Sequence, residues 1–200
     1  MRKLQIVVLA GFLAAMSCVA ASAQSQLSDG EKAAVLLARY EVWANETYTT
    51  QSGSELKVDV YVPPLARPLA NGEARPATPV VVQIHGGGWV AGQKEASQLR
   101  VLPYLQMGFA AVNVEYRLAK VAPAPAAVED CRCALRWVLR NAKQLGFDPS
   151  RIVVTGGSAG GHLALITAML PASAGLDRGC TTTDETGWED AGLQGEMKVA

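Results

Sequence analysis

Two glycine-rich stretches carry the residue types that could do chemistry in this chain of 200 residues. The more informative one is Gly156–Gly157–Ser158–Ala159–Gly160, a G-x-S-x-G pattern. A β-branched run at residues 152–155 precedes it and apolar residues at helical spacing follow it, which is the strand–turn–helix setting of a nucleophile elbow. Such a turn exposes a serine hydroxyl at a helix N-terminus, where backbone N–H groups favour developing negative charge. Ser158 is therefore predicted to be a catalytic nucleophile.

Other glycine-rich loops fit this stretch less well. A dinucleotide-binding fingerprint has glycines at relative positions 1, 3 and 6, but Ser158 or Ala159 takes the third position in either frame. A phosphate-binding P-loop has lysine after its second glycine, where this chain has His162. A glycine-rich turn without a catalytic role remains open on this stretch alone.

The second stretch is His85–Gly86–Gly87–Gly88–Trp89, which directly follows an apolar strand-like run at residues 79–84. Acyl transfer passes through a tetrahedral oxyanion, which needs backbone N–H donors held in place. Three consecutive glycines leave such donors unobstructed by side chains. The stretch also lies upstream of the elbow, which is the order expected of an oxyanion loop. The two motifs together indicate acyl transfer by a serine nucleophile.

With two further runs, these motifs resemble the α/β-hydrolases of the hormone-sensitive-lipase-like group of esterases and lipases, or close carboxylesterase relatives. The matching residues are 85–89, 115–119, 125–130 and 156–161, and the resemblance covers about residues 56–170. It implies an α/β-hydrolase fold, with a mostly parallel, doubly wound sheet and helices on both faces. It also implies hydrolysis of small uncharged carboxylic esters through an acyl-enzyme.

The resemblance implies roles for individual residues by motif position. The oxyanion donors would be the N–H groups of Gly87, Gly88 and Ala159. The residues that support the two turns would be His85, Gly86, Gly156 and Gly160. The chain departs from the commonest pattern of the group at Gly157, where an acidic residue is frequent, and at Lys120, where Pro-Glu often follows. The alternatives are a peptidase or amidase of the same fold and a non-catalytic, hydrolase-like binding module.

A serine nucleophile needs a histidine base that a carboxylate orients, and in this fold both follow the serine in sequence. The chain has two histidines. His85 precedes Ser158 and is expected to brace the oxyanion loop, whereas His162 is expected to be a hydrogen-bonded packing residue. Acidic residues after Ser158 lie in irregular sequence: Asp177, Asp184, Glu185, Glu189, Asp190 and Glu196. Residues 1–200 are therefore expected to lack the triad acid and base, as the N-terminal portion of a longer hydrolase.

Charged residues and cysteines elsewhere have structural interpretations. Arg117 is expected to form a buried ion pair, the alternative being a contact with a substrate carboxylate, and Glu129 and Asp130 are expected to be structural residues at the start of a helix. On this helix, Cys131 is expected to lie on the apolar face and Cys133 to lie off it, more exposed. A disulfide is predicted between Cys180 and Cys133 or Cys131, because Cys131 and Cys133 diverge by about 200° on one helix and cannot easily pair. No Cys/His spacing suits zinc, and no cofactor is predicted.

The first 23 residues are predicted to be a secretory signal peptide, cleaved near Ala23, so that the protein would be secreted or periplasmic. Arg2 and Lys3 precede a short apolar run that ends at Ala21–Ser22–Ala23, although Cys18 could also belong to a poor lipoprotein box.

Cleavage of the signal peptide would remove two basic residues and no acidic ones, which changes the net charge from zero to −2. No run of basic residues indicates that the protein binds nucleic acid. No later run suits a membrane span. The oligomeric state stays open.

The elements that would position these motifs follow from periodicity. Residues 24–200 are expected to form the N-terminal part of one α/β-hydrolase domain, in which strands alternate with helices. A capped helix is expected after Ser28, a half-buried antiparallel strand at 56–62, and a proline-rich surface loop up to residue 79. The next expected element is a helix within 92–106, with an apolar side made of Leu99, Leu102 and Leu105. The elbow strand is expected to follow a strand at 109–114 and a long helix at 126–144.

Overall fold

The computed structural model describes residues 28–64, 77–176 and 178–180. The chain divides into two compact units, Met1–Ala38 and Arg39–Ala200. The described part of the first unit is α2 (Asp29–Leu37), which begins at the predicted cap. There the Ser28 hydroxyl accepts the N–H of Glu31, and the Glu31 carboxylate accepts the N–H of Ser28. The predicted signal peptide and most of the proline-rich loop lie outside the described residues.

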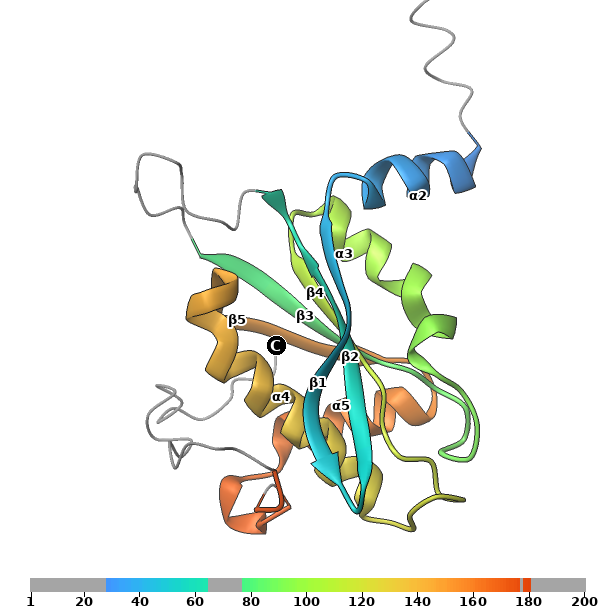
Figure 1. Cartoon of the computed structure of the whole chain (residues 1–200), viewed down its shortest axis with the longest axis vertical. Helices are drawn as coiled ribbons and strands as arrows, with labels where there is room; N and C mark the ends of the chain where they lie inside the picture. The colour runs from blue at the N-terminus through green and yellow to red at the C-terminus, as the bar shows by residue number, and fades with distance from the viewer. Residues whose placement is uncertain (1–27, 65–76, 177, 181–200) are drawn as a thin grey trace, which may run out of the picture. The chain divides into compact units, whose positions relative to one another are not determined.

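The second unit is built on a five-stranded sheet with the order β1-β2-β4-β3-β5 (Figure 1). The antiparallel strands β1 (Glu41–Gln51) and β2 (Ser54–Val62) form one edge, and β2 also pairs antiparallel with β4 (Ala110–Val114). Strand β3 (Thr78–Ile84) pairs in parallel with both β4 and β5 (Phe147–Gly156). The predicted α/β-hydrolase fold class is confirmed.

Helices cover both faces of this sheet. On one face, α4 (Ala126–Leu145) and α5 (Ala159–Met169) pack against alternate residues of the strands, including Val80, Val82 and Ile84. The intervening Val81 and Gln83 face the opposite side. That side is covered by the 3₁₀ helix η2 (Lys94–Val101) and by α3 (Leu102–Gln106). Strands β3 and β4 are buried on both faces, which explains their continuous apolar runs. Strand β5, the last in the sheet order, is only partly buried, and Val153 is exposed, so the β-branched run at 152–155 is less buried than its sequence predicts.

Strand β2 is more deeply buried than its alternating sequence predicts. Its apolar residues point inward as expected, but Asp59 and Tyr61 on the second face are buried too. Asp59 is buried because η2 covers it: Lys94 Nζ lies 2.9 Å from each carboxylate oxygen of Asp59, and Lys94 itself is 3% exposed. The prediction of a half-buried strand is therefore wrong for this part of β2. The face that carries Asp59 has a polar sequence, but η2 covers it through the ion pair between Lys94 and Asp59.

The predicted helix within residues 92–106 is instead two short helices, η2 and α3. Leu105 is buried as expected, but Leu99 is 67% exposed. A 3₁₀ helix has three residues per turn, so the buried side of η2 carries Lys94 and Ser97 instead of an α-helical leucine stripe. The Ser97 hydroxyl donates to Asn113 Oδ1 on β4 at 2.8 Å. The polar side of this segment therefore faces the sheet.

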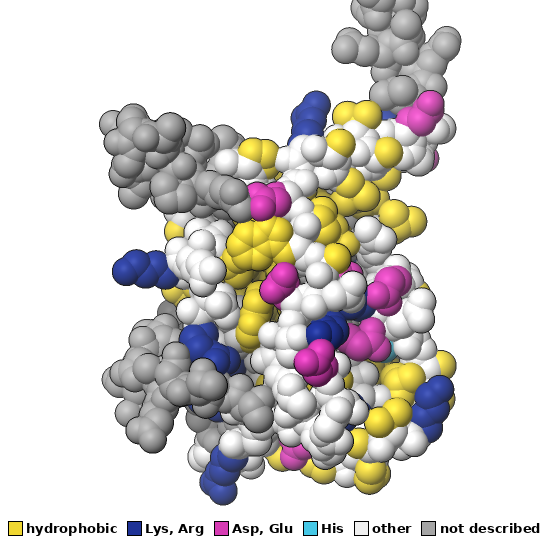
Figure 2. Space-filling view, in the orientation of Figure 1, with side chains coloured by type: hydrophobic (Ala, Val, Ile, Leu, Met, Phe, Trp, Pro, Cys, Tyr) yellow, Lys and Arg dark blue, Asp and Glu magenta, His cyan; other side chains and the backbone are white. Residues whose placement is uncertain are grey.

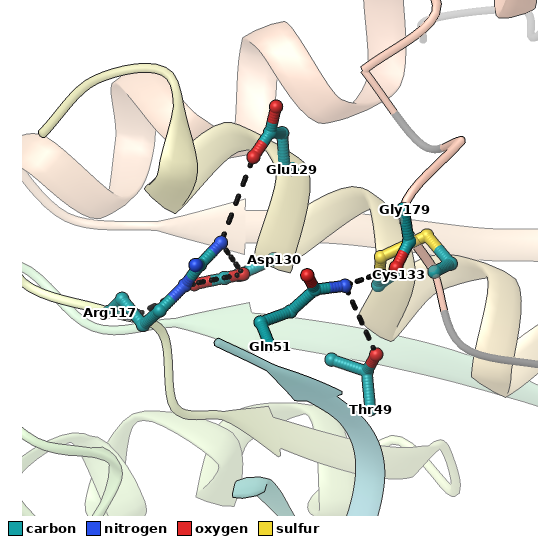
Figure 3. The surroundings of a disulfide bond; sticks show 8 residues. Thr49, Gln51, Arg117, Glu129, Asp130, Cys133 and Gly179 are labelled. Carbon is teal, nitrogen blue, oxygen red and sulfur yellow. Dashed lines mark hydrogen bonds and ion pairs between the residues drawn. A yellow bond between two sulfur atoms is a disulfide. The ribbon is translucent and has the colours of Figure 1, made fainter. Parts of the chain in front are cut away.

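A disulfide joins α4 to the segment that follows α5 (Figure 3). It links Cys133 to Cys180, so the first of the two predicted pairings is confirmed. Cys133 was expected to lie off the apolar face, but it is 1% exposed and belongs to the core, where Cys180 packs against it. Gln51 Nε2 donates to the carbonyl of Gly179 and holds the same segment against the end of β1. Cys131 stays reduced, and burial raises the pKa of its thiol well above the ordinary value.

Losing this disulfide should lower the free energy of unfolding by about 2–5 kcal/mol, because the bond closes a long loop of the unfolded chain. The suitable variant is Cys180→Ser, since Cys133 lies within the core. Urea unfolding should show a lower midpoint for this variant than for the oxidised wild type. Dithiothreitol should lower the wild-type midpoint to that of the variant and leave the variant unchanged. Equal midpoints for the oxidised wild type and the variant would contradict the expected stabilisation.

Within the described ranges, no helix combines the length and the apolar character needed to cross a bilayer. On the face seen in Figure 2, Lys and Arg side chains are scattered among acidic and apolar ones. This face therefore lacks the continuous basic surface that is typical of proteins that bind nucleic acid.

Candidate active site

Ser158 lies in the turn between β5 and α5, in the position that the sequence pattern predicts. Its φ is 55° and its ψ is −123°. A residue other than glycine in such a conformation costs about 1–3 kcal/mol and persists only where the surrounding structure fixes it. Two hydrogen bonds close the turn: the N–H of Gly160 donates to Gly157 O at 3.0 Å, and the N–H of His162 donates to Ser158 O at 3.1 Å. The serine is thus held at the first turn of α5.

The start of α5 lies in backbone contact with the end of β3. A Cβ atom added to Gly160 would lie 2.3 Å from the carbonyl oxygen of Ile84 and 2.6 Å from that of His85. A Cβ atom on Gly156 would lie 2.6 Å from the same Ile84 oxygen. Glycine at these positions permits a strand-to-helix approach that any side chain would block. The approach places the HGGG run, which begins at His85, directly beside the elbow.

The HGGG run folds into a tight loop next to the Ser158 side chain. A Cβ atom built on Gly86 lies 3.7 Å from Ser158 Cβ. Gly87 has a φ of +122°, and a Cβ atom there would lie 1.9 Å from Ala91 O, so the turn requires glycine at this position. The N–H groups of Val90 and Ala91 donate to Gly87 O at 3.2 and 3.0 Å. Gly87 and Gly88 are exposed, which leaves their backbone accessible to a ligand.

The His85 side chain lies beneath this loop and is 2% exposed. Its Nδ1 is 2.8 Å from Gly86 O, and its ring stacks on Tyr116 with centroids 4.2 Å apart. The Tyr116 hydroxyl donates to His85 O at 3.2 Å, and burial raises the pKa of Tyr116 to about 12. His85 Nε2 lies 3.7 Å from Glu115 Oε1. These contacts hold the buried His85 ring between Tyr116 and the HGGG loop, the position expected of a residue that braces this loop.

Arg117 forms the buried ion pair that the sequence analysis predicts (Figure 3). Its guanidinium donates to both oxygens of Asp130 at 2.8–3.1 Å, and its backbone N–H donates to Asp130 Oδ2 at 2.9 Å. Hydrogen bonding to this carboxylate raises the pKa of Arg117. Glu129 lies 3.7 Å from the same guanidinium. The structural interpretation of Arg117, Glu129 and Asp130 is confirmed, because the charge is already paired within the chain.

His162 is exposed, which differs from the hydrogen-bonded packing residue predicted from sequence. Its ring contacts Trp89 edge to face, with centroids 5.3 Å apart and planes at 89°. Within the described part of the chain, neither histidine side chain hydrogen-bonds to the Ser158 hydroxyl. The acidic residues after Ser158 that the sequence analysis considered lie outside the described residues.

Sequence reasoning missed Arg132, a fully buried residue of α4 that holds the C-terminal end of α5. Its Nη1 donates to the carbonyls of Thr167 and Leu170 at 3.2 and 2.8 Å. A cation at this end of a helix complements both the unsatisfied carbonyls and the helix dipole. No sequence signal indicated this contact, because it depends on how α4 and α5 pack together. Arg132 thus fixes the helix that begins at the elbow.

Comparisons with known proteins match the same region. The BD-FAE family model matches residues 58–192. Carboxylesterase NlhH of Mycobacterium tuberculosis is 42% identical over 124 residues, which are 61% of this chain and 36% of that protein. The structure titled Bacterial Heroin Esterase has a TM-score of 0.59 and 31% identity, covering 81% of this chain and 46% of its own. The thermophilic esterase Est2 of Thermogutta terrifontis has a TM-score of 0.57 and 29% identity, covering 75% of this chain and 49% of its own. The chain therefore spans about a third to a half of the length of these relatives.

Proposed function

Because the chain belongs to the BD-FAE family and has the α/β-hydrolase fold, we propose that the protein is a carboxylic ester hydrolase with Ser158 as its nucleophile. The observation that carries this proposal is the contact between the two motifs, in which a Cβ atom built on Gly86 lies 3.7 Å from Ser158 Cβ. This contact brings an exposed glycine loop beside a serine at a helix N-terminus. The relatives NlhH and Est2 are named as esterases, which supports the same reaction class.

In the proposed reaction, Ser158 Oγ attacks the ester carbonyl and the N–H groups of Gly87, Gly88 and Ala159 bind the oxyanion. Ala159 is the first residue of α5, so its N–H has no acceptor within the helix. This N–H lies at the helix N-terminus, where the helix dipole is positive and favours an oxyanion. The alcohol leaves with a proton, and water then hydrolyses the acyl-enzyme and restores the serine. The general base would be a histidine oriented by a carboxylate. Among the described residues, no histidine side chain hydrogen-bonds to the Ser158 hydroxyl.

The experiment that tests this function compares matched esters and amides. The protein produced from its complete gene is assayed with 4-nitrophenyl butyrate and with butyryl 4-nitroanilide. We expect ester turnover, and amide turnover at least about 100-fold slower. Faster turnover of the anilide would favour a peptidase or amidase of the same fold. Absence of turnover with both substrates would favour a hydrolase-like binding module, an alternative supported by the lack of a hydrogen bond between a described histidine and Ser158.

We also propose that the protein acts outside the cytoplasm, in the periplasm or the medium. The predicted signal peptide at residues 1–23 and the Cys133–Cys180 disulfide support this location, because disulfides persist in oxidising compartments. N-terminal sequencing of the protein recovered from its native host should begin at Gln24. A sequence that begins at Met1 would contradict the proposed location.

A further inference from the structure

The guanidinium of Arg100 lies against the elbow residue that precedes Ser158. The three atoms nearest to a Cβ built on Gly157 all belong to Arg100: Nη1 at 3.4 Å, Cζ at 3.6 Å and Nη2 at 3.9 Å. Arg100 lies in the last turn of η2, where it is exposed while the next residue, Val101, is buried. The guanidinium therefore lies in van der Waals contact with the position of a Cβ atom at residue 157.

The charge of Arg100 is available to a ligand. Other cations near the site are paired, Lys94 with Asp59 and Glu95, and Arg117 with Asp130. Within the part of the chain that the structure describes, Arg100 is exposed and forms no ion pair or hydrogen bond. Glycine at position 157 offers no acidic side chain that could neutralise it.

Arg100 is also close to the proposed reacting atoms. Consecutive Cα atoms are about 3.8 Å apart, so the guanidinium lies within about 9 Å of Ser158 Cα. A Cβ atom on Gly86 would lie 2.6 Å from Gly157 O, so the oxyanion loop borders the same elbow residue. A substrate with its carbonyl at Ser158 would therefore reach Arg100 with a group only a few bonds away.

We propose that Arg100 determines substrate specificity by binding a carboxylate on the ester, a few bonds from the scissile carbonyl. The proposal rests on the proposed function of Ser158 and refines its substrate class from uncharged to anionic esters. A guanidinium is suited to this role because its planar fork binds a carboxylate through two parallel hydrogen bonds. The anionic group lies in either the acyl or the alcohol part of the ester.

The test uses two pairs of esters, each of which compares a free carboxylate with its methyl ester, and the protein is produced from its complete gene. The acyl pair is mono-4-nitrophenyl succinate and its methyl ester, and the alcohol pair is 4-acetoxybenzoate and its methyl ester. For at least one pair, Arg100→Gln should lower the ratio of anionic to neutral kcat/KM by about tenfold, the effect of one charged hydrogen bond. Arg100→Lys should restore part of this ratio and Arg100→Glu should lower it further. The wild-type preference should weaken with added salt, because the pair is exposed to solvent.

The matched control is Lys143→Gln, an exposed cation at the far end of α4, which should leave both ratios unchanged. Unchanged ratios in Arg100→Gln, with neutral esters still hydrolysed through Ser158, would overturn the role of Arg100 alone. Failure of the wild type to hydrolyse any of the four esters would instead refute the proposed function, and this inference with it.

Discussion

Replacing Ser158 by alanine should lower the turnover of a neutral ester by about 10⁵–10⁶-fold in the protein produced from its complete gene. The expectation follows from the proposed role of Ser158, because the loss of a serine nucleophile removes the covalent route and leaves only the weak catalysis of the oxyanion hole and substrate binding. Initial rates with 4-nitrophenyl butyrate measure the effect. Circular dichroism spectra and unfolding midpoints of both proteins establish that the variant is folded.

The matched control for this variant is Ser150→Ala. Ser150 lies on the same strand as the elbow, near its opposite end, and its hydroxyl donates to Asp148 at 2.6 Å. We expect its turnover to stay within twofold of the wild type. A Ser158→Ala protein that retains a tenth or more of wild-type turnover would show that another residue is the nucleophile.

Replacing Gly87 by valine should lower turnover by about 10²–10³-fold, the effect of losing one oxyanion donor. Any Cβ at this position would lie 1.9 Å from Ala91 O, and a β-branched side chain cannot adopt the φ of +122° without strain. The loop must therefore leave its present conformation, which displaces its N–H groups. The measurement is kcat for a neutral ester, together with the unfolding midpoint of the variant.

Gly88→Ala is the sterically matched comparison. A Cβ there meets no atom closer than 4.0 Å, so alanine faces only the cost of a left-handed backbone with a φ of +61°. The loss for this variant should not exceed about tenfold. Wild-type turnover by a folded Gly87→Val protein would refute the assignment of this loop to the oxyanion hole.

Local patterns predicted the secondary structure near the site because their causes are local. The β-branched run before His85 forms a buried parallel strand, and Ser28 caps a helix through a contact three residues away. The run before Gly156 also forms a parallel strand, but the expectation that it is buried is wrong: β5 is the last strand in the sheet order and Val153 is 38% exposed. The resemblance to hormone-sensitive-lipase-like esterases is also confirmed by the family match and the esterase relatives. It could be recognised from the sequence because it depends on short motifs. These features need no knowledge of distant segments.

The errors concern residues that a distant segment covers. Asp59 is buried because Lys94 pairs with it, and Cys133 is buried because the segment ending at Cys180 packs over it. The 3₁₀ geometry of η2 placed Leu99 in solvent although its spacing suited an α-helix. Periodicity describes one element at a time, so it cannot reveal which other element will cover a polar face.

The candidate site shows the same division. The positions of Ser158 and the glycine loop were predictable, because each motif has its own backbone requirement. A buried ion pair of Arg117 was predictable because a charge beside a buried strand needs a partner, but the sequence did not identify Asp130 as that partner. The edge-to-face contact of His162 with Trp89 and the placement of Arg100 over Gly157 were not, since both depend on how separate loops meet.

The most direct test of Ser158 as the nucleophile is covalent labelling with a fluorophosphonate, followed by peptide mapping by mass spectrometry. The protein produced from its complete gene should gain one phosphonyl group, located on the peptide that contains Ser158, and should lose its ester turnover in proportion to labelling. The Ser158→Ala variant should gain none. A phosphonyl group on a different residue, or undiminished ester turnover in a fully labelled protein, would contradict the proposed mechanism.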